Sequence, residues 1–225
     1  MIGIIVAMDS EWNAIVEIMD QVENIQISGI SMAKGKLNNK NVIIMKSGVG
    51  KGNAAMSMTI LFENFVIDKV INIGTAGGLK PEQKVLDAVV STKVVQHDFD
   101  TSAIDGVDGI GLYYEADQEL VIKIKQVLEN MDVTVFNGLI ASGDQFIAED
   151  DKRMRLERLF PDAICAEMEA GAIGQVCSHY HVPFVVLRSL SDVACNQDSH
   201  IDFSVYVTHA AARSAKLCKE LMKVL

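Results

Sequence analysis

Residues 183–194 read Pro183-Phe-Val-Val-Leu-Arg-Ser-Leu-Ser-Asp-Val-Ala194. The first half is a continuous apolar run with β-branched residues, which is typical of a parallel strand buried on both faces. Arg188, Ser191 and Asp192 follow at its carboxyl end, where open α/β sheets bind ligands. We therefore expect a buried strand that carries polar side chains into a binding site. The alternative is that Arg188 and Asp192 form an ion pair with a purely structural role.

Two further charges lie just upstream, in the segment Cys165-Ala-Glu-Met-Glu-Ala-Gly-Ala172. Glu167 and Glu169 flank Met168, and the rest of the segment is apolar. Both acids precede a short helical pattern, so Glu169 could simply favour the positive end of that helix. Its position before the predicted binding strand makes it a candidate site residue as well.

The rest of the chain alternates strand and helix patterns, which predicts an α/β domain with a largely parallel or mixed sheet. Asn38-Asn39 is a plausible hairpin turn between two of the strands. No linker, repeat or low-complexity segment interrupts residues 1–225, so we expect one domain. The expected strands are Ile2–Met8, Ile25–Ile27, Ser31–Leu37, Val42–Ser47, Lys69–Ile73, Leu86–Val95 and Val133–Ala141, and the expected helices follow Asp9-Ser10, span Asn53–Phe62, begin at Asp117, and span Asp151–Phe160 and Asp202–Leu225.

Glycine-rich segments follow two of the expected strands. Ser47-Gly-Val-Gly-Lys-Gly52 leads into a helix, a geometry that exposes backbone N–H groups to a ligand. It is not a phosphate-binding Walker loop, because Lys51 is followed by glycine rather than serine or threonine. Gly74-Thr-Ala-Gly-Gly78 is interpreted as a second turn, where the backbone approaches something closely. Two such turns in one α/β chain favour a binding cleft.

Composition excludes several classes of protein. The chain has 225 residues, 49% of them hydrophobic, and a formal net charge of −10. Because no Lys/Arg cluster stands out, we expect neither nucleic acid nor an anionic membrane as partner. The four cysteines lack metal-ligand or disulfide spacing, so a metal site is not expected and a reducing cytoplasm is the expected location. Signal-peptide and transmembrane patterns are absent from the sequence.

Two other regions attract attention. Glu11 falls in the first turn after the first strand, either as a solvated acid favoured by the helix dipole or as a base directed into a cleft. His97-Asp98 ends a long strand, and adjacent strand residues point to opposite faces, so we expect a role in ordering loops rather than a catalytic pair. Residues 99–115 lack periodicity, and a loop of this length is typical of a lid, a binding loop or an interface.

Taken together and in order, these segments resemble the bacterial 5'-methylthioadenosine/S-adenosylhomocysteine nucleosidases, members of the purine nucleoside phosphorylase superfamily. The resemblance covers essentially the whole chain. The motifs that carry it are Gly3-Ile-Ile-Val-Ala-Met8 with Glu11, Lys46-Ser-Gly-Val-Gly-Lys51, Asn72-Ile-Gly-Thr-Ala-Gly-Gly78, Ser142-Gly-Asp-Gln-Phe-Ile147, Ala166-Glu-Met-Glu-Ala170 and Arg188-Ser-Leu-Ser-Asp192.

The resemblance implies a three-layer α/β/α sandwich around a mixed, partly barrel-like sheet. It also implies a homodimer without metal or organic cofactor. The implied reaction is hydrolysis of the N-glycosidic bond between adenine and a 5'-thio-substituted ribose, which serves methionine salvage and removes S-adenosylhomocysteine.

The resemblance further implies the roles of individual residues. Asp192, oriented by Ser191, would protonate adenine N7, and Glu11 would activate the attacking water with support from Arg188. Glu169 would bind the ribose hydroxyls. The other implied substrate contacts are Met168 against the sugar, Phe146 stacked on adenine, the Ile147 backbone at the adenine edge, the backbone of Thr75, Ala76 and Gly77 near the nucleoside, Met8, and Val49 with Phe203 around the 5'-thio group.

One segment departs from the family pattern. Relatives often carry Val-Thr-Ala-Phe-Gly-Tyr after the His-Asp pair, in a loop that reaches the neighbouring subunit's 5' pocket, whereas this chain has Thr101-Ser-Ala-Ile104. The preferred 5' substituent is therefore open, and 5'-deoxyadenosine or aminodeoxyfutalosine are possible substrates. A phosphate-dependent nucleoside phosphorylase and a non-catalytic nucleoside-binding protein are the competing hypotheses.

Overall fold

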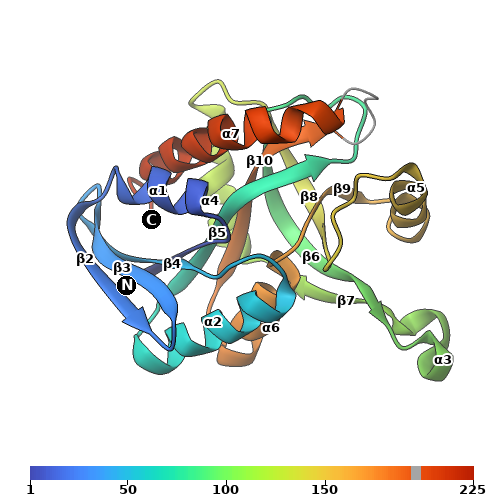
Figure 1. Ribbon diagram of the computed structural model, residues 1–225, viewed down its shortest axis with the longest axis horizontal. Coiled ribbons are helices and arrows are strands. Elements are labelled where there is room, and N and C mark those ends of the chain that lie inside the picture. The colour runs from blue at the N-terminus through green and yellow to red at the C-terminus, as the bar shows by residue number, and fades with distance from the viewer. Residues whose placement is uncertain (194–198) are drawn as a thin grey trace.

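The computed structural model describes residues 1–193 and 199–225, with backbone alone for residues 199–205. Within this part of the chain the strands form one mixed sheet in the order β10-β6-β8-β9-β5-β1-β4-β3-β2, and β7 pairs with β6 (Figure 1). The strands are β1 (Ile2–Val6), β2 (Asp20–Ile27), β3 (Ile30–Leu37), β4 (Lys40–Lys46), β5 (Lys69–Gly78), β6 (Ala88–Asp100), β7 (Ile110–Glu115), β8 (Val135–Ser142), β9 (Ala163–Glu167) and β10 (Phe184–Val193). The helices are α1 (Asp9–Val16), α2 (Lys51–Asn64), α3 (Ser102–Asp105), α4 (Gln118–Glu129), α5 (Asp150–Leu159), α6 (Ala170–Tyr180) and α7 (Ser199–Leu221), with a 3₁₀ helix at Gly106–Gly109.

Part of the sheet closes on itself. Strand β5 pairs with both β10 and β9, and β10, β6, β8 and β9 pair in turn, so these strands form a ring. The remaining strands β1, β4, β3 and β2 extend from the other side of β5 as an open sheet. The predicted mixed and partly barrel-like sheet is therefore confirmed.

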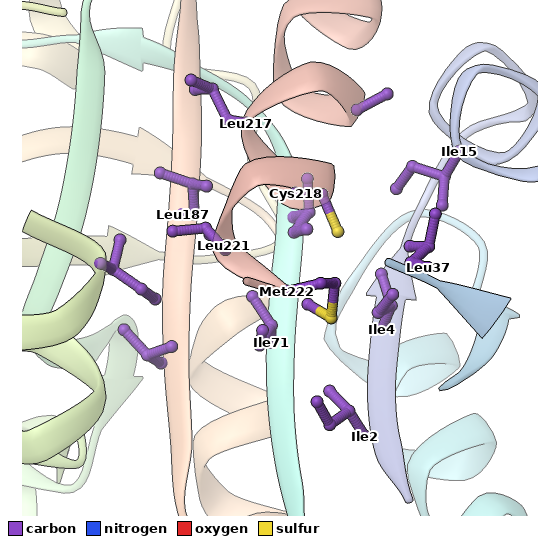
Figure 2. Close-up of a cluster of buried hydrophobic side chains, with 14 of the residues drawn as sticks. Ile2, Ile4, Ile15, Leu37, Ile71, Leu187, Leu217, Cys218, Leu221 and Met222 are labelled. Carbon is purple, nitrogen blue, oxygen red and sulfur yellow. The ribbon is translucent and has the colours of Figure 1, made fainter. Parts of the chain in front are cut away.

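Helices cover the sheet in two layers, which confirms the three-layer prediction. Helices α1, α4 and α7 lie over one face, and α2 and α6 lie over the other (Figure 1). Strand side chains alternate between the layers, so Ile4 faces the α7 side and Ile5 the α2 side. In the first layer, Leu217 and Leu221 of α7 and the following Met222 pack over the strands (Figure 2). Burial of each such side chain contributes about 1.5–3 kcal/mol.

Local signals for turns and helix starts were confirmed in two places and wrong in one. Asn38 and Asn39 form the hairpin turn with φ of 45° and 62°, and Asp117 caps α4 by accepting a hydrogen bond from the Leu120 N–H at 2.9 Å. Asp9, however, is already helical and Met8 occupies the cap position. The backbone N–H of Met8 donates a hydrogen bond to the Glu11 carboxylate at 3.0 Å.

Two segments that were predicted to lack regular structure are regular. Residues 74–78 do not turn but continue β5, because β10 pairs with them along one side and β9 pairs with Gly77 and Gly78 on the other. Residues 99–115 contain α3, the 3₁₀ helix and β7, which pairs with β6. Strand β9 was not predicted at all. Residues 74–78 and β9 take their order from pairing with distant strands, whereas residues 102–109 are held by local hydrogen bonds.

None of the helices within the described residues has both the length and the apolar character that crossing a membrane would require.

Glycines of two helices differ in how closely they approach neighbouring side chains. A Cβ added to Gly174 of α6 would lie 2.9 Å from Phe184 and 3.0 Å from Val94, closer than side chains tolerate. A Cβ added to Gly52 of α2 would meet nothing within 4 Å. Glycine at position 174 is therefore required by packing, whereas at position 52 it only weakens the helix.

We expect Gly174→Ala to lower the free energy of unfolding by about 1–3 kcal/mol through overpacking. The matched control, Gly52→Ala, should raise it by up to about 1 kcal/mol because alanine is the better helix former. Urea unfolding followed by circular dichroism measures both. Stabilisation of both variants would contradict the tight contact between α6 and the sheet.

Candidate active site

A cavity of about 270 Å³ opens where strands β1, β5, β9 and β10 end. This is the edge at which parallel α/β sheets present ligand sites, because loops there leave the sheet and leave a crevice behind them. Among the described residues its lining consists of Ala7, Met8, Glu11, Val49, Ile73, Gly74, Thr75, Ala76, Gly77, Leu79, Gln145, Phe146, Ile147, Ala166, Glu167, Met168, Glu169, Arg188, Ser191 and Asp192.

All but one of the site residues expected from the sequence line this cavity, and the remaining one lies outside the residues whose side chains are described. The expected residues that line the cavity are Met8, Glu11, Val49, Thr75, Ala76, Gly77, Phe146, Ile147, Met168, Glu169, Arg188, Ser191 and Asp192. Phe203 lies outside the residues whose side chains are described. Segments separated by more than a hundred positions in the chain therefore meet in one cavity.

Glu11 is held by backbone N–H groups from two elements. Its Oε2 accepts hydrogen bonds from Ala7 at 2.9 Å and Met8 at 3.0 Å, and its Oε1 accepts one from Thr75 at 3.1 Å. The side chain is nearly inaccessible, and this burial raises the pKa of Glu11, opposed by the charge of Arg188 and by the N–H donors. Glu11 is therefore not the solvated acid considered from the sequence, because it is buried, and its carboxylate lines the cavity.

Asp192 and its neighbour both line the cavity because the strand is irregular there. Leu190 pairs with Ala76 and Asp192 with Gly77, so Ser191 is an extra residue in β10. Such a bulge breaks the alternation that would point the two side chains to opposite faces. The Ser191 hydroxyl donates to Asp192 Oδ1 at 2.7 Å, and a Cβ on Gly77 would lie 3.2 Å from Asp192 Oδ2.

Glu169 lies at the start of α6 and reaches toward the opposite wall. Its Oε1 accepts a hydrogen bond from the Gly50 N–H at 2.9 Å. Gly50 has φ of 94°, a conformation that favours glycine, so the loop after β4 can present this N–H. Burial, reinforced by the nearby charge of Glu167, raises the pKa of Glu169 to about 7.

Arg188 is the cation at the centre of the cavity floor, and it pairs with Glu167 rather than with Asp192. Its Nη2 contacts Glu167 Oε2, donates to Asn72 Oδ1 at 2.7 Å and lies 3.8 Å from Glu169 Oε2. Arg188 Nη1 is buried without a hydrogen-bond partner. It lies beside Glu11, because a Cβ on Gly74 would be 2.8 Å from Nη1 and 2.9 Å from Glu11 Oε1. The structural ion pair between Arg188 and Asp192 that the sequence suggested is therefore wrong, because Arg188 pairs with Glu167.

The mouth of the cavity is apolar. Phe146 is 51% exposed and Val49 is 48% exposed, unusual fractions for large hydrophobic side chains. Ile147 and Met168 line the cavity between the mouth and the charged floor. An apolar entrance above a few convergent polar groups is the usual form of a small-molecule site.

The His97-Asp98 pair acts beside the cavity, consistent with the loop-ordering role expected for it. Asp98 forms an ion pair with Lys51 Nζ at 2.5 Å and accepts a hydrogen bond from the Asp144 N–H at 2.9 Å. Asp144 in turn accepts one from the Lys51 N–H at 2.7 Å. These bonds join Asp98 of β6 and the start of α2 to the loop after β8, which carries Phe146.

Two polar residues of the site had no role assigned from the sequence. Asn72 interrupts the apolar strand Lys69–Ile73, which was the available signal for a buried hydrogen-bonding function. Glu167 was noticed as a charge in an apolar segment without a role. Both bind Arg188, and only the pairing of β5, β9 and β10 reveals that.

The geometry suits chemistry that needs an acid and a base on different sides of one ligand. Glu11 lies against Gly74 and Asp192 against Gly77, positions three residues apart in β5. Along an extended strand this corresponds to about 10 Å, enough for a ring and a water molecule between the two carboxyl groups.

Comparison with known proteins shows similarity along the whole chain. A sequence model of the phosphorylase superfamily matches residues 1–223. The chain is 38% identical over 229 residues to the 5'-methylthioadenosine/S-adenosylhomocysteine nucleosidase of Staphylococcus haemolyticus, with 100% of both chains covered.

Solved structures agree with this similarity. The nucleosidase of the same name from Neisseria meningitidis, in complex with methylthio-immucillin-A, is 33% identical with a TM-score of 0.94, covering 100% of this chain and 99% of that one. Futalosine hydrolase of Helicobacter pylori is 32% identical with a TM-score of 0.92, covering 100% and 97%.

The raised pKa of Glu169 predicts how stability depends on pH. Its pKa is about 7 in the fold against an ordinary 4.5, so the folded protein binds more protons than the unfolded chain between these values. The contribution of Glu169 to stability is therefore complete below about pH 4.5 and is lost as pH rises through 7, by about 3 kcal/mol.

Glu169→Gln should abolish that loss. We expect the variant to gain about 3 kcal/mol over the wild type between pH 4 and pH 8. Chemical unfolding at a series of pH values measures the difference in stability between the two proteins. If the difference in the free energy of unfolding between the two proteins stayed constant with pH, it would contradict a buried Glu169 with a raised pKa.

Proposed function

The chain belongs to the 5'-methylthioadenosine/S-adenosylhomocysteine nucleosidase family of the phosphorylase superfamily, and from this premise we propose that it hydrolyses the N-glycosidic bond of these two nucleosides. The products would be adenine and the 5-thio-substituted ribose. The observation that carries the proposal is that Glu11 and Asp192 line one cavity.

In the proposed reaction, the bond between C1' of the ribose and N9 of adenine breaks while Asp192 gives a proton to adenine N7. Adenine then leaves as a neutral base rather than an anion. The Ser191 hydroxyl, 2.7 Å from Asp192 Oδ1, would orient the carboxyl group. Gly77 supports this arrangement because its missing side chain lets the nucleoside approach the carboxyl group.

Water would add to C1' from the Glu11 side, and Glu11 would take its proton. Burial raises the pKa of Glu11, which makes it a stronger base than an exposed glutamate. The buried Nη1 of Arg188 lies beside Glu11 with a donor to spare, so it would hold the oxygen of the attacking water. Opposed acid and base groups around a cationic sugar are the arrangement of inverting glycosidases.

Glu169 would bind the ribose hydroxyls. As the glycosidic bond lengthens, the ribose ring becomes cationic, and an ionised carboxylate in a buried site stabilises that charge more than water would. Met168 would pack against the sugar, and Val49 and Phe203 would contact the 5'-thio group. The exposed Phe146 would stack on adenine, with the Ile147 backbone and the β5 segment Thr75–Gly77 along the base.

Hydrolysis is favoured over phosphorolysis by the charges of the cavity. A phosphate nucleophile needs cationic groups, whereas Glu11 places a carboxylate where that nucleophile would stand. Arg188, the cationic side chain among the described lining residues, is already paired with Glu167. A non-catalytic nucleoside-binding protein is disfavoured because it would need neither Glu11 nor Asp192 in one cavity.

The proposed substrates extend beyond these two nucleosides. The similarity to a futalosine hydrolase supports aminodeoxyfutalosine, besides 5'-deoxyadenosine, as a further substrate. Within the cell, the proposed reaction would serve methionine salvage and the removal of S-adenosylhomocysteine.

We further propose a homodimer in which residues 99–115 lie near the neighbouring active site. Figure 1 shows α3 projecting beyond the end of β7, away from the helical layers. Ile104 is 86% exposed and Val107 is 84% exposed in this projecting segment. Apolar side chains presented in this way are typical of interfaces.

Asp192→Asn should reduce kcat for adenine release from 5'-methylthioadenosine by about 10²–10⁴-fold, because asparagine cannot give up a proton. The assay contains no phosphate, and added phosphate should leave the wild-type rate unchanged. The exposed Asp162→Asn serves as control for loss of one negative charge and should keep wild-type activity. Equal rates for Asp192→Asn and wild type, or a requirement for phosphate, would reject the mechanism.

Replacement of Ile104 and Val107 together by aspartate should shift the protein from dimer to monomer and raise KM for 5'-methylthioadenosine. Sedimentation velocity and steady-state kinetics measure the two effects. Val66→Asp is the matched control, since Val66 is 82% exposed in the connection between α2 and β5 and lies outside the projecting segment. A double variant that stays dimeric with unchanged KM would contradict the proposed interface.

A further inference from the structure

We propose that Glu167 is a positioning residue: it binds both Arg188 and the backbone that carries Glu169, and so fixes the placement of Glu169 and the share of the guanidinium charge that Glu169 receives. This inference deepens the proposed function and rests on it. It assigns a role to the acidic residue that the mechanism above leaves unused.

The contacts of Glu167 are made by both of its oxygens. Glu167 Oε2 accepts hydrogen bonds from the Glu169 N–H at 3.1 Å and the Ala170 N–H at 2.9 Å, and Oε1 lies 3.1 Å from the Ala170 N–H. Oε2 also contacts Arg188 Nη2. The Glu167 side chain is 2% exposed, so water does not compete for these bonds. One carboxylate therefore joins Arg188 of β10 to the first turn of α6.

The same contacts distribute charge within the site. Arg188 Nη2 touches Glu167 but remains 3.8 Å from Glu169 Oε2. The charged groups that face Glu169 are Glu167 from β9, Arg188 from β10 and Glu11 from α1, and Gly50 adds a backbone N–H. One guanidinium thus serves several carboxylates, and Glu167 holds the largest share of it.

This distribution matters for the proposed chemistry. A Glu169 paired directly with Arg188 would be ionised at every working pH, but its charge would already be neutralised. With Arg188 bound to Glu167, the Glu169 charge stays available for the cationic ribose of the transition state. The cost is that Glu169 is partly protonated at neutral pH in the empty site, with a pKa of about 7.

A purely structural role for Glu167 predicts something different. If Glu167 only capped α6, a glutamine would keep a carbonyl oxygen for the same N–H groups. Stability would change, while the ionisation of Glu169 would not. The pH dependence of the reaction therefore separates positioning from capping.

The decisive experiment is the pH profile of kcat/KM for 5'-methylthioadenosine with wild type and Glu167→Gln. Glu167→Gln removes the Glu167 charge and releases Arg188 toward Glu169. The acidic limb of its kcat/KM profile should therefore move to lower pH by about one unit or more. Glu167→Asp retains the charge, so its acidic limb should stay at the wild-type position. Asn72→Ser removes a neutral partner of the same guanidinium, and it should also leave the limb in place.

Each result has a defined meaning. An unshifted limb in folded Glu167→Gln, or an equal shift in Asn72→Ser, would overturn the proposal while wild-type hydrolysis leaves the proposed function standing. Wild type that releases no adenine would instead overturn the proposed function. If Glu167→Gln does not fold, the Glu167→Asp variant decides. A kcat at least about tenfold below the wild-type value, with the acidic limb at the wild-type position, supports the positioning role. A kcat equal to that of the wild type overturns it.

Discussion

The buried contact between Arg188 and Glu167 is the interaction on which the rest of the site depends. Arg188 comes from β10, Glu167 from β9 and their shared neighbour Asn72 from β5, so one guanidinium joins three strands of the closed part of the sheet. A buried arginine without partners would be prohibitively costly, and removal of either partner of such a pair is strongly destabilising. The strand ends that carry the proposed catalytic groups are therefore held in one arrangement.

The same contact explains why the site is electrostatically strained. Glu11, Glu167 and Glu169 are all buried near one cation, and burial raises the pKa of Glu11 and of Glu169. A hydrophobic floor would give a more stable fold, but it would offer no base and no carboxylate for a cationic sugar. Backbone N–H groups from Thr75 and Gly50 partly compensate, and glycine at position 50 is what allows the second of these bonds.

Much of the fold could be predicted from the sequence because its signals are local. The apolar runs of β1 and β10, the Asp117 cap and the Asn38-Asn39 hairpin each depend on a few neighbouring residues. The failures have one cause in common. Residues 74–78 and β9 take their strand conformation from pairing with each other and with other distant strands, which no local pattern reports.

For the site, the sequence by itself determined that Glu11, Arg188 and Asp192 lie near the ends of predicted buried strands and that Glu169 precedes a helix. Only the tertiary structure decided their partners: Arg188 binds Glu167, Glu11 is held by Thr75, and a bulge at Ser191 turns Asp192 into the cavity. The physical reason is that the residue types and the ends of strands depend on nearby sequence, whereas the register between distant strands decides which buried charges meet.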